Sequence, residues 1–295
     1  MAVLNHIGGL KDIPITGNRI FTYGGTGDLL IMFDDLVSRF GDNTKYIGVG
    51  FSLGGGVLIR FLGEDITRQS KFVCGISLCQ GYSCDEAFRL PQWKGARRVY
   101  NFMMTKKMLK MIKRHKKQLF DNHPAVVGHN GAHASCNGFT NGVTNGVSNK
   151  KPVSVPCFSN ERDSNGISTN LNNISCPDDK TWSAASFEAL DEYFTRRMMG
   201  FSCVSDLIKW TTCVPHFQGI PHLPVLIVNA YDDPVIPPEL HKYPIEFTNY
   251  NPNAMFVRTD HGGHLGYFEG GWFFHNEMRW TDRLIFQYIT ALKNV

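Results

Sequence analysis

The stretch Gly50-Phe51-Ser52-Leu53-Gly54 decides the fold, because it matches the pattern G-x-S-x-G. In that pattern the serine occupies a strained turn between a strand and a helix, so its hydroxyl projects above the sheet. Small residues on either side let the backbone fold that tightly. The amide of Leu53 then lies at a helix N-terminus, where it can donate to an oxyanion. The motif predicts Ser52 as a nucleophile and Leu53 as an oxyanion donor.

The residues around the motif favour this interpretation. An apolar strand, Tyr46-Ile47-Gly48-Val49, precedes Ser52, and Gly54-Gly55-Gly56 opens the following helix. Three consecutive glycines lower helix stability, so they are expected where helix, strand and loops approach closely. The alternative is an ordinary glycine-rich turn between a strand and a helix that carries no chemistry.

Strand and helix signals alternate on both sides of this motif. Such alternation predicts a mostly parallel sheet with helices on both faces. Together with the strand–Ser52–helix turn it is typical of an α/β-hydrolase fold. The predicted strands are 2–5, 45–51, 72–78, 225–230 and 254–258, and the predicted helices between and after them are 27–40, 53–62, 238–247 and 276–292.

The middle of the chain, 82–220, has a different pattern and predicts a helical lid between two parts of the sheet domain, 1–81 and 221–295. Helices are expected over 82–122, 183–199 and 202–210. The segment 105–118 is strongly basic with interleaved Met and Leu. A solvated helix that packs its apolar side on the domain is the favoured interpretation. An anionic membrane surface is the alternative.

Residues 123–179 are rich in Asn, Gly and Ser and include a repeated Asn-Gly tetrapeptide that begins at Asn137. Such composition buries too little apolar surface to offset ordering, so we expect a disordered insertion. A metal site built from His123, His129, His133 and Cys136 is disfavoured, because nothing around them predicts a folded cluster.

Composition narrows the function further. The net charge of +4 and the absence of zinc-finger or basic-aromatic motifs give no indication of nucleic-acid binding. The eight scattered cysteines are interpreted mostly as free thiols. No apolar run is long enough to span a bilayer and no secretory signal is present. Because the chain opens at once on the expected strand Ala2–Asn5, we expect a truncated N-terminus.

A nucleophilic serine needs a base, and the base needs an orienting acid. Two later loops supply them in the order Ser, Asp, His. Asp232 and Asp233 follow the strand 225–230, and His261 and His264 follow the strand 254–258. Spacing alone leaves open which aspartate is the acid and which histidine is the base.

The chain resembles the abhydrolase-domain lipase and esterase family. The shared stretches are Ala2-Val-Leu-Asn-His-Ile-Gly-Gly, Phe21-Thr-Tyr-Gly, Val49-Gly-Phe-Ser-Leu-Gly-Gly, Cys79-Gln-Gly-Tyr-Ser, Val228-Asn-Ala-Tyr-Asp-Asp-Pro and His261-Gly-Gly-His-Leu-Gly-Tyr-Phe-Glu-Gly. The resemblance implies Ser52 as nucleophile, Asp233 as orienting acid and His264 as base and acid. It implies hydrolysis of lipid esters, in particular monoacylglycerol, without a cofactor or a metal.

The resemblance also implies a membrane-associated protein, although the anchor typical of the family is absent from this chain, which would otherwise be cytoplasmic. The expected partners are a lipid ester and a membrane surface, and no nucleic acid. A family strand beside the nucleophile strand, whose loop supplies the second oxyanion donor, is also absent. The alternative is therefore a catalytically impaired truncated form, or a member that binds a lipid or hormone without catalysis.

Overall fold

The computed structural model describes residues 1–295 except 18, 91–96, 121–177, 272–273 and 294–295. Its described part contains one four-stranded parallel sheet with the strand order β1-β2-β3-β4. The parallel arrangement of strands predicted from the sequence is confirmed. The strands are β1 (Tyr46–Phe51), β2 (Phe72–Leu78), β3 (Val225–Ala230) and β4 (Ala254–Thr259).

Burial along β3 explains why this strand is a continuous apolar run. All six of its residues are buried. Val225 and Ile227 belong to one core cluster, whereas Leu226, Val228 and Ala230 belong to another on the opposite face. A parallel strand covered on both faces needs apolar side chains at every position rather than at alternate ones.

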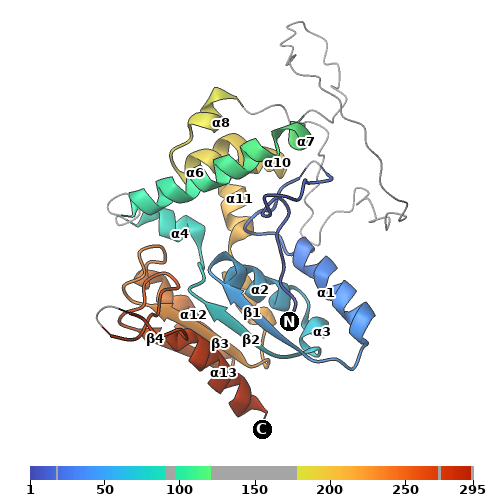
Figure 1. Ribbon diagram of the computed structural model, residues 1–295, viewed down its shortest axis with the longest axis vertical. Helices are drawn as coiled ribbons and strands as arrows, with labels where there is room; N and C mark the ends of the chain where they lie inside the picture. The colour runs from blue at the N-terminus through green and yellow to red at the C-terminus, as the bar shows by residue number, and fades with distance from the viewer. Residues whose placement is uncertain (18, 91–96, 121–177, 272–273, 294–295) are drawn as a thin grey trace, which may run out of the picture.

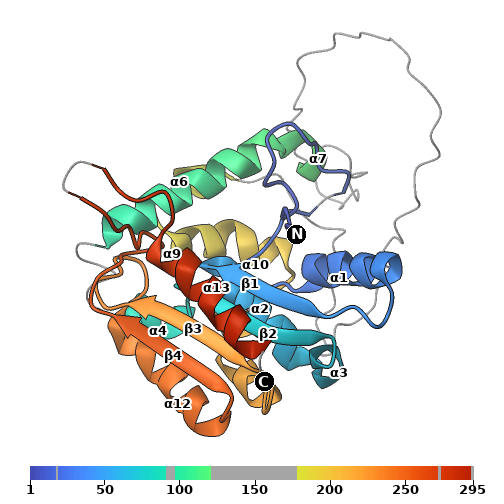
Figure 2. The same cartoon turned by 60° about the horizontal axis from the view of Figure 1, so that its bottom comes forward.

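Helices cover both faces of the sheet, as Figures 1 and 2 show. One core cluster joins the sheet to helices α1, α2, η3 and α12. The other joins it to α13 through Leu284, Ile285 and Tyr288. The elements of this domain outside the sheet are α1 (Gly27–Phe40), α2 (Leu53–Glu64), α3 (Ile66–Gln69), η3 (Val214–Gly219), η4 (Pro238–His241), α12 (Lys242–Tyr250) and α13 (Trp280–Leu292).

The covering is incomplete over β1, one of the two edge strands of the described sheet. Ile47, Val49 and Phe51 pair in register with Cys74, Ile76 and Leu78 of β2, so they lie on the face that α13 covers farther along the sheet. Their side chains are nevertheless 38%, 41% and 50% exposed. The α13 layer therefore stops short of β1.

A second group of helices lies above the sheet (Figure 1). It has its own core, in which Leu109 and Ile112 of one helix pack against Leu190, Phe194 and Met198. No described helix has both the length and the apolar character that a bilayer crossing requires. The elements are α4 (Cys84–Arg89), α6 (Arg98–Arg114), α7 (Lys116–Phe120), α8 (Asp179–Ser183), α9 (Phe187–Leu190), η2 (Asp191–Thr195), α10 (Arg196–Met198) and α11 (Val204–Thr211).

The strand predicted over Ala2–Asn5 is wrong. These residues form no strand, and Val3 is 65% exposed. A strand requires a hydrogen-bonded neighbour, and none of the described strands pairs with this segment. The following segment packs instead on the helical group, where Ile15 and Ile20 join its core. Its backbone is held there by His115, whose Nε2 lies 3.2 Å from the carbonyl oxygen of Gly8.

Two other expectations have different outcomes. The helix predicted over 183–199 is divided into α9, the π-helical turn η2 and α10. The Asn-rich insertion predicted over 123–179 lies outside the described residues except for its last two. The His123–Cys136 cluster lies wholly outside them. The described cysteines are free thiols, as predicted: Cys74, Cys79, Cys84, Cys203 and Cys213.

Candidate active site

Ser52 lies where β1 ends and α2 begins. Its backbone has φ 50° and ψ −119°, a conformation that costs a non-glycine residue about 1–3 kcal/mol. The turn is anchored to the neighbouring strand, because the Ser52 amide donates to the carbonyl oxygen of Leu78 at 2.7 Å. The strained turn predicted from G-x-S-x-G is therefore present.

The glycines around Ser52 do not contribute equally. A Cβ on Gly50 would lie 2.3 Å from the carbonyl oxygen of Gly54, and a Cβ on Gly55 would lie 2.3 Å from Oγ of Ser77. A Cβ on Gly54 would meet nothing within 4 Å. The expectation that small residues are required on both sides of the serine thus holds for Gly50 and not for Gly54. The other crowded position is Gly55 instead.

Asp233 lies in the loop after β3 and is fully buried. One carboxylate oxygen, Oδ1, accepts hydrogen bonds from the amides of Val235 and Ile236 at 2.7 and 3.0 Å. The other, Oδ2, lies 2.9 Å from Nδ1 of His264. The two amides hold the carboxylate in one orientation, so that its second oxygen stays directed at the imidazole.

His264 lies in the loop after β4, and its ring connects the other two groups. Its Nε2 lies 2.8 Å from Oγ of Ser52, and its side chain is 20% exposed. The loop is bent sharply, with left-handed backbone at Gly263, Leu265 and Tyr267. The imidazole is thus in contact with a buried acid on one side and with a hydroxyl on the other.

The second aspartate and histidine form a separate and more exposed pair. Nδ1 of His261 lies 3.4 Å from Oδ2 of Asp232, with the two side chains 90% and 42% exposed. Burial raises the pKa of Asp232, but hydrogen bonds from the Gly263 amide and from His261 outweigh it and lower that pKa. Asp232 therefore ties the histidine loop to the β3 loop through the Gly263 amide.

Leu53 is the first residue of α2, directly after Ser52. The amides of the first helical turn have no acceptor within their own helix and point along its axis. They also lie at the positive end of the helix dipole. The Leu53 amide therefore lies where negative charge beside Ser52 would be favoured, and its role as oxyanion donor stays a prediction.

Arg97 was not predicted from the sequence as part of this site. It lies directly before α6, and its Nη2 donates at 3.0 Å to the backbone carbonyl oxygen of Asp233. Its Nη1 is buried and has no partner among the described residues. The two residues are 136 positions apart in the sequence. A single arginine belongs to no sequence motif, so nothing in the sequence indicates this contact.

Cys79 is a further neighbour of the site. Its sulfur, one Asp233 oxygen and one His264 nitrogen lie within 4.8 Å of one another, a spacing that a metal ion would fit. Asp233 and His264 are, however, already hydrogen-bonded to each other. Burial raises the pKa of the Cys79 thiol to about 11, which keeps it protonated near neutral pH. The donor set does not favour a metal, because a thiol binds metal as its thiolate.

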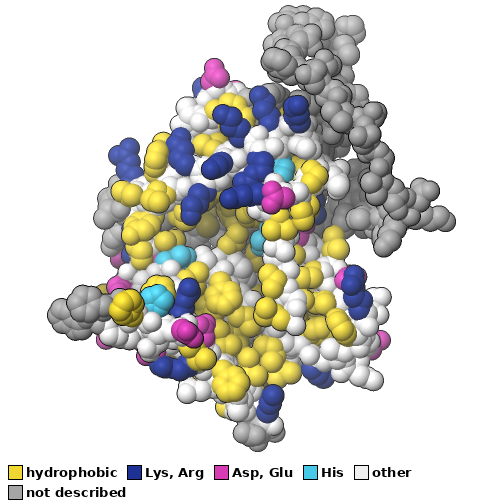
Figure 3. Space-filling model, in the orientation of Figure 1, with side chains coloured by type: hydrophobic (Ala, Val, Ile, Leu, Met, Phe, Trp, Pro, Cys, Tyr) yellow, Lys and Arg dark blue, Asp and Glu magenta, His cyan; other side chains and the backbone are white. Residues whose placement is uncertain are grey.

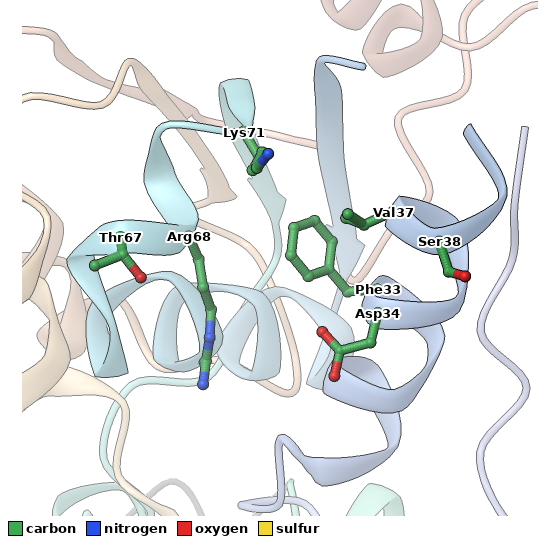
Figure 4. Close-up of a pocket in the computed structure, with 7 residues that line it drawn as sticks. All are labelled: Phe33, Asp34, Val37, Ser38, Thr67, Arg68 and Lys71. Atoms are coloured by element: carbon green, nitrogen blue, oxygen red, sulfur yellow. The ribbon is translucent and has the colours of Figure 1, made fainter. Parts of the chain in front are cut away.

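A surface cavity of about 350 Å³ lies elsewhere, between α1 and the α3–β2 turn (Figure 4). Its cations already have partners, because Arg68 donates to the Phe61 carbonyl and Lys71 pairs with Asp42. The cavity contains none of the residues discussed above. It is lined by Phe33, Asp34, Val37, Ser38, Thr67, Arg68 and Lys71.

The aromatic residues of the helical group have different surroundings. Phe194 is 5% exposed and belongs to the core of the helical group, whereas Tyr100 and Phe102 are 43% and 44% exposed on α6. Phe187 packs edge-on against Tyr23. Trp93 lies outside the described residues. The aromatic residues therefore do not act as one group.

Comparisons with known proteins agree with this architecture. A family described as alpha/beta hydrolase fold matches residues 11–271. Abhydrolase domain-containing protein 2 of Drosophila melanogaster is 33% identical over 99% of this chain and 62% of its own length. Monoacylglycerol lipase ABHD2 of Mus musculus is 32% identical over 99% of this chain and 58% of its own. The chain thus spans about three fifths of the length of these relatives.

Two further similarities are more limited, one in the length that it covers and the other in sequence identity. Human phospholipase ABHD3 is 32% identical over 114 residues, which is 39% of this chain and 27% of its own. Among solved structures, a meta-cleavage product hydrolase aligns with 98% of this chain and 78% of its own, with a TM-score of 0.44 and 12% identity.

Proposed function

Because the chain belongs to the alpha/beta hydrolase fold family, we propose that it is a serine hydrolase that cleaves carboxylic esters of lipids, with monoacylglycerol as its preferred class. One observation carries the proposal. The ring of His264 lies within hydrogen-bond distance of Oγ of Ser52 at 2.8 Å and of Oδ2 of Asp233 at 2.9 Å. This is the arrangement of nucleophile, base and orienting acid that acyl transfer requires.

In the first half of the proposed reaction, Oγ of Ser52 attacks the ester carbonyl carbon while Nε2 of His264 takes the hydroxyl proton. The carbonyl oxygen becomes an oxyanion, and the amide of Leu53 donates to it. His264 then gives the proton to the departing alcohol oxygen, the carbon–oxygen bond breaks, and an acyl-serine remains. Asp233 holds the imidazole by Nδ1–H and stabilises the positive charge that forms on the ring.

In the second half, water takes the place of the alcohol. His264 removes a proton from the water as it attacks the acyl carbon, and returns the proton to Oγ of Ser52 as the carbon–serine bond breaks. The products are a fatty acid and free enzyme. Every proton transfer passes through Nε2 of His264, while Asp233 and the amide of Leu53 stabilise the charges that form.

The substrate class is supported by the relatives that extend over 99% of this chain, several of which are named monoacylglycerol lipases. A monoacylglycerol has one long acyl chain and is held largely in lipid assemblies, so an enzyme acting on it works at a lipid surface. We therefore include a membrane surface among the proposed partners.

Labelling with a fluorophosphonate probe tests the nucleophile. The wild-type chain should form a covalent adduct at Ser52, and Ser52→Ala should form none. Ser77→Ala is a matched control, because Ser77 is a buried serine at the end of the neighbouring strand. Equal labelling of Ser52→Ala and wild type would reject Ser52.

Hydrolysis assays then test the substrate class. We expect release of fatty acid from monoacylglycerol to exceed release from triacylglycerol, with p-nitrophenyl butyrate as a water-soluble reference ester. The alternative is a catalytically impaired or purely lipid-binding protein. That protein would bind monoacylglycerol and hydrolyse none of the three, and its Ser52→Ala variant would bind as tightly as the wild-type chain.

A further inference from the structure

Helix α6 carries an outward face that the proposed chemistry does not use. Its N-terminal part is apolar, with Val99, Phe102 and Met103 at 61%, 44% and 53% exposure. The rest is cationic and also exposed. We call the following residues together the α6 face: Val99, Phe102, Met103, Lys106, Lys107, Lys110, Lys113 and Arg114.

These side chains share one side of the helix. At 3.6 residues per turn, the positions of the α6 face fall within half of the helical circumference. The opposite side holds Asn101, Thr105, Leu109 and Ile112, all buried against the lid. The helix is therefore amphipathic in an unusual way, with a packed inner side and an outer side that is apolar at one end and cationic at the other.

The charge of this segment is one-sided. Residues 97–120 contain nine Lys and Arg and no Asp or Glu, whereas the whole chain has a net charge of only +4, so the remaining residues have a net charge of −5. No ion pair joins Lys107, Lys110 or Lys113 to any described carboxylate. Figure 3 shows the Lys and Arg side chains gathered over this part of the molecule, beside hydrophobic ones. The electrostatic field on the side of the molecule that carries residues 97–120 therefore attracts anions.

We propose that the α6 face docks on an anionic phospholipid surface. The lysines contact headgroup phosphates, and Val99, Phe102 and Met103 enter the boundary between headgroups and acyl chains. A cationic helix face with apolar side chains fits such a boundary. Nucleic acid also attracts the cations, but it offers no apolar phase for three exposed hydrophobic side chains on one side of the helix.

The apolar end of the α6 face is the end nearest to the catalytic site. Arg97, which immediately precedes α6, donates to the carbonyl oxygen of Asp233. A docked α6 therefore brings the Ser52 region to the lipid surface, where an ester can enter without crossing water. This consequence for substrate delivery rests on the proposed function, whereas the docking itself does not.

Vesicle co-sedimentation of the full chain tests the docking. Phosphatidylcholine vesicles with about one third phosphatidylserine should bind the protein, and pure phosphatidylcholine vesicles should bind it much more weakly. The variant Lys107→Gln/Lys110→Gln/Lys113→Gln should lower the partition coefficient roughly 100-fold, about fivefold for each cation removed. The control Lys11→Gln/Lys209→Gln/Lys293→Gln removes the same charge from exposed positions elsewhere and should bind like wild type.

A second variant tests the apolar end without changing charge. Val99→Ser/Phe102→Ser should weaken binding about tenfold or more, whereas Phe286→Ser, which removes a 72% exposed aromatic from α13, should not. Equal binding by the triple-glutamine variant and its control overturns the proposal. So does binding of a duplex DNA oligonucleotide in preference to vesicles at the same salt. All of these variants replace exposed residues, and far-ultraviolet circular dichroism verifies that they fold.

The outcome is separable from that of the proposed function. Ser52→Ala should bind vesicles like wild type, because docking requires no chemistry. If docking is absent, the wild-type chain still hydrolyses p-nitrophenyl butyrate. If hydrolysis is absent, the α6 variants still lose vesicle binding.

Discussion

The guanidinium of Arg97 donates a hydrogen bond to the backbone carbonyl oxygen of Asp233 at 3.0 Å. The donor lies at the start of the lid helix α6, and the acceptor lies in the loop that carries the proposed acid. This contact joins the helical group to the loop that carries Asp233 across 136 residues of sequence. A residue outside the sheet thus contacts the backbone of Asp233 directly.

Arg97→Met should lower kcat for p-nitrophenyl butyrate about tenfold, because a small displacement of Asp233 misaligns the imidazole of His264. Arg98→Met changes the neighbouring arginine and is the matched control. A positioning role predicts that the pH profile of kcat/KM also moves, while an Arg97→Lys variant recovers part of the rate. Unchanged kcat in Arg97→Met with normal folding would show that the contact has no part in positioning.

The adjacent aspartates should differ greatly in their effect on rate. Asp233→Asn should lower kcat by about 10⁴-fold, because an amide favours the wrong imidazole tautomer. Asp232→Asn should lower it less than about tenfold, because its partner His261 is 90% exposed and does not contact Ser52. Steady-state kinetics on the same ester measure both, and His264→Ala with His261→Ala form a second matched pair. Similar losses in both aspartate variants would contradict the assignment.

The two glycines of the serine motif should also differ, in stability rather than rate. Gly50→Ala forces a Cβ within 2.3 Å of the Gly54 carbonyl oxygen, so we expect a loss of about 2 kcal/mol or more in the free energy of unfolding. Gly54→Ala meets open space in a helix and should be neutral or stabilise by up to about 1 kcal/mol. Urea unfolding followed by circular dichroism gives both values, and a reversed order would refute the steric argument.

Asp191 should make the protein less stable as the pH rises from about 4 to about 7. Burial raises its pKa to about 7, although hydrogen bonds from Tyr23 and Thr195 act in the opposite direction. The unfolded chain releases this proton near pH 4 and the folded chain near pH 7. The cost of ionisation is therefore absent below about pH 4, grows between these values and is complete above about pH 7, with an upper limit of roughly 4 kcal/mol.

The variant Asp191→Asn removes this titration. Its free energy of unfolding should fall less than that of wild type between pH 5 and 8, measured by urea titration at each pH. Asp206→Asn, at an exposed position on α11, should keep the wild-type slope. Parallel curves for wild type and Asp191→Asn would mean that the carboxyl is ionised throughout this range or is hydrated.

Most of the sheet could be predicted from the sequence because its signals are local. The apolar runs of β2 and β3 and the glycines that end α1 or open α2 lie within or beside the elements themselves. The segment Ala2–Asn5 shows the limit of this reasoning. Its residues favour a strand, but strand formation depends on a partner that no local pattern specifies.

The site divides in the same way. Ser52 could be found from its own neighbours, whereas the choice between Asp232 and Asp233 depends on which carboxylate the amides of Val235 and Ile236 hold. Spacing cannot distinguish two adjacent residues on a loop. Arg97 could not be predicted from the sequence at all. Its contact is to a backbone carbonyl oxygen, which every residue type has, so the sequence of the partner loop does not indicate the contact.

The uncovered strip on β1 has a practical consequence for handling this chain. Ile47, Val49 and Phe51 lie on a strand that is outermost in the described sheet, so its backbone edge and its apolar face are open together. Such an edge can template strand addition between molecules. Solutions of residues 1–295 should therefore scatter more light as concentration and temperature rise, and Val49→Lys should act as a gatekeeper against that association.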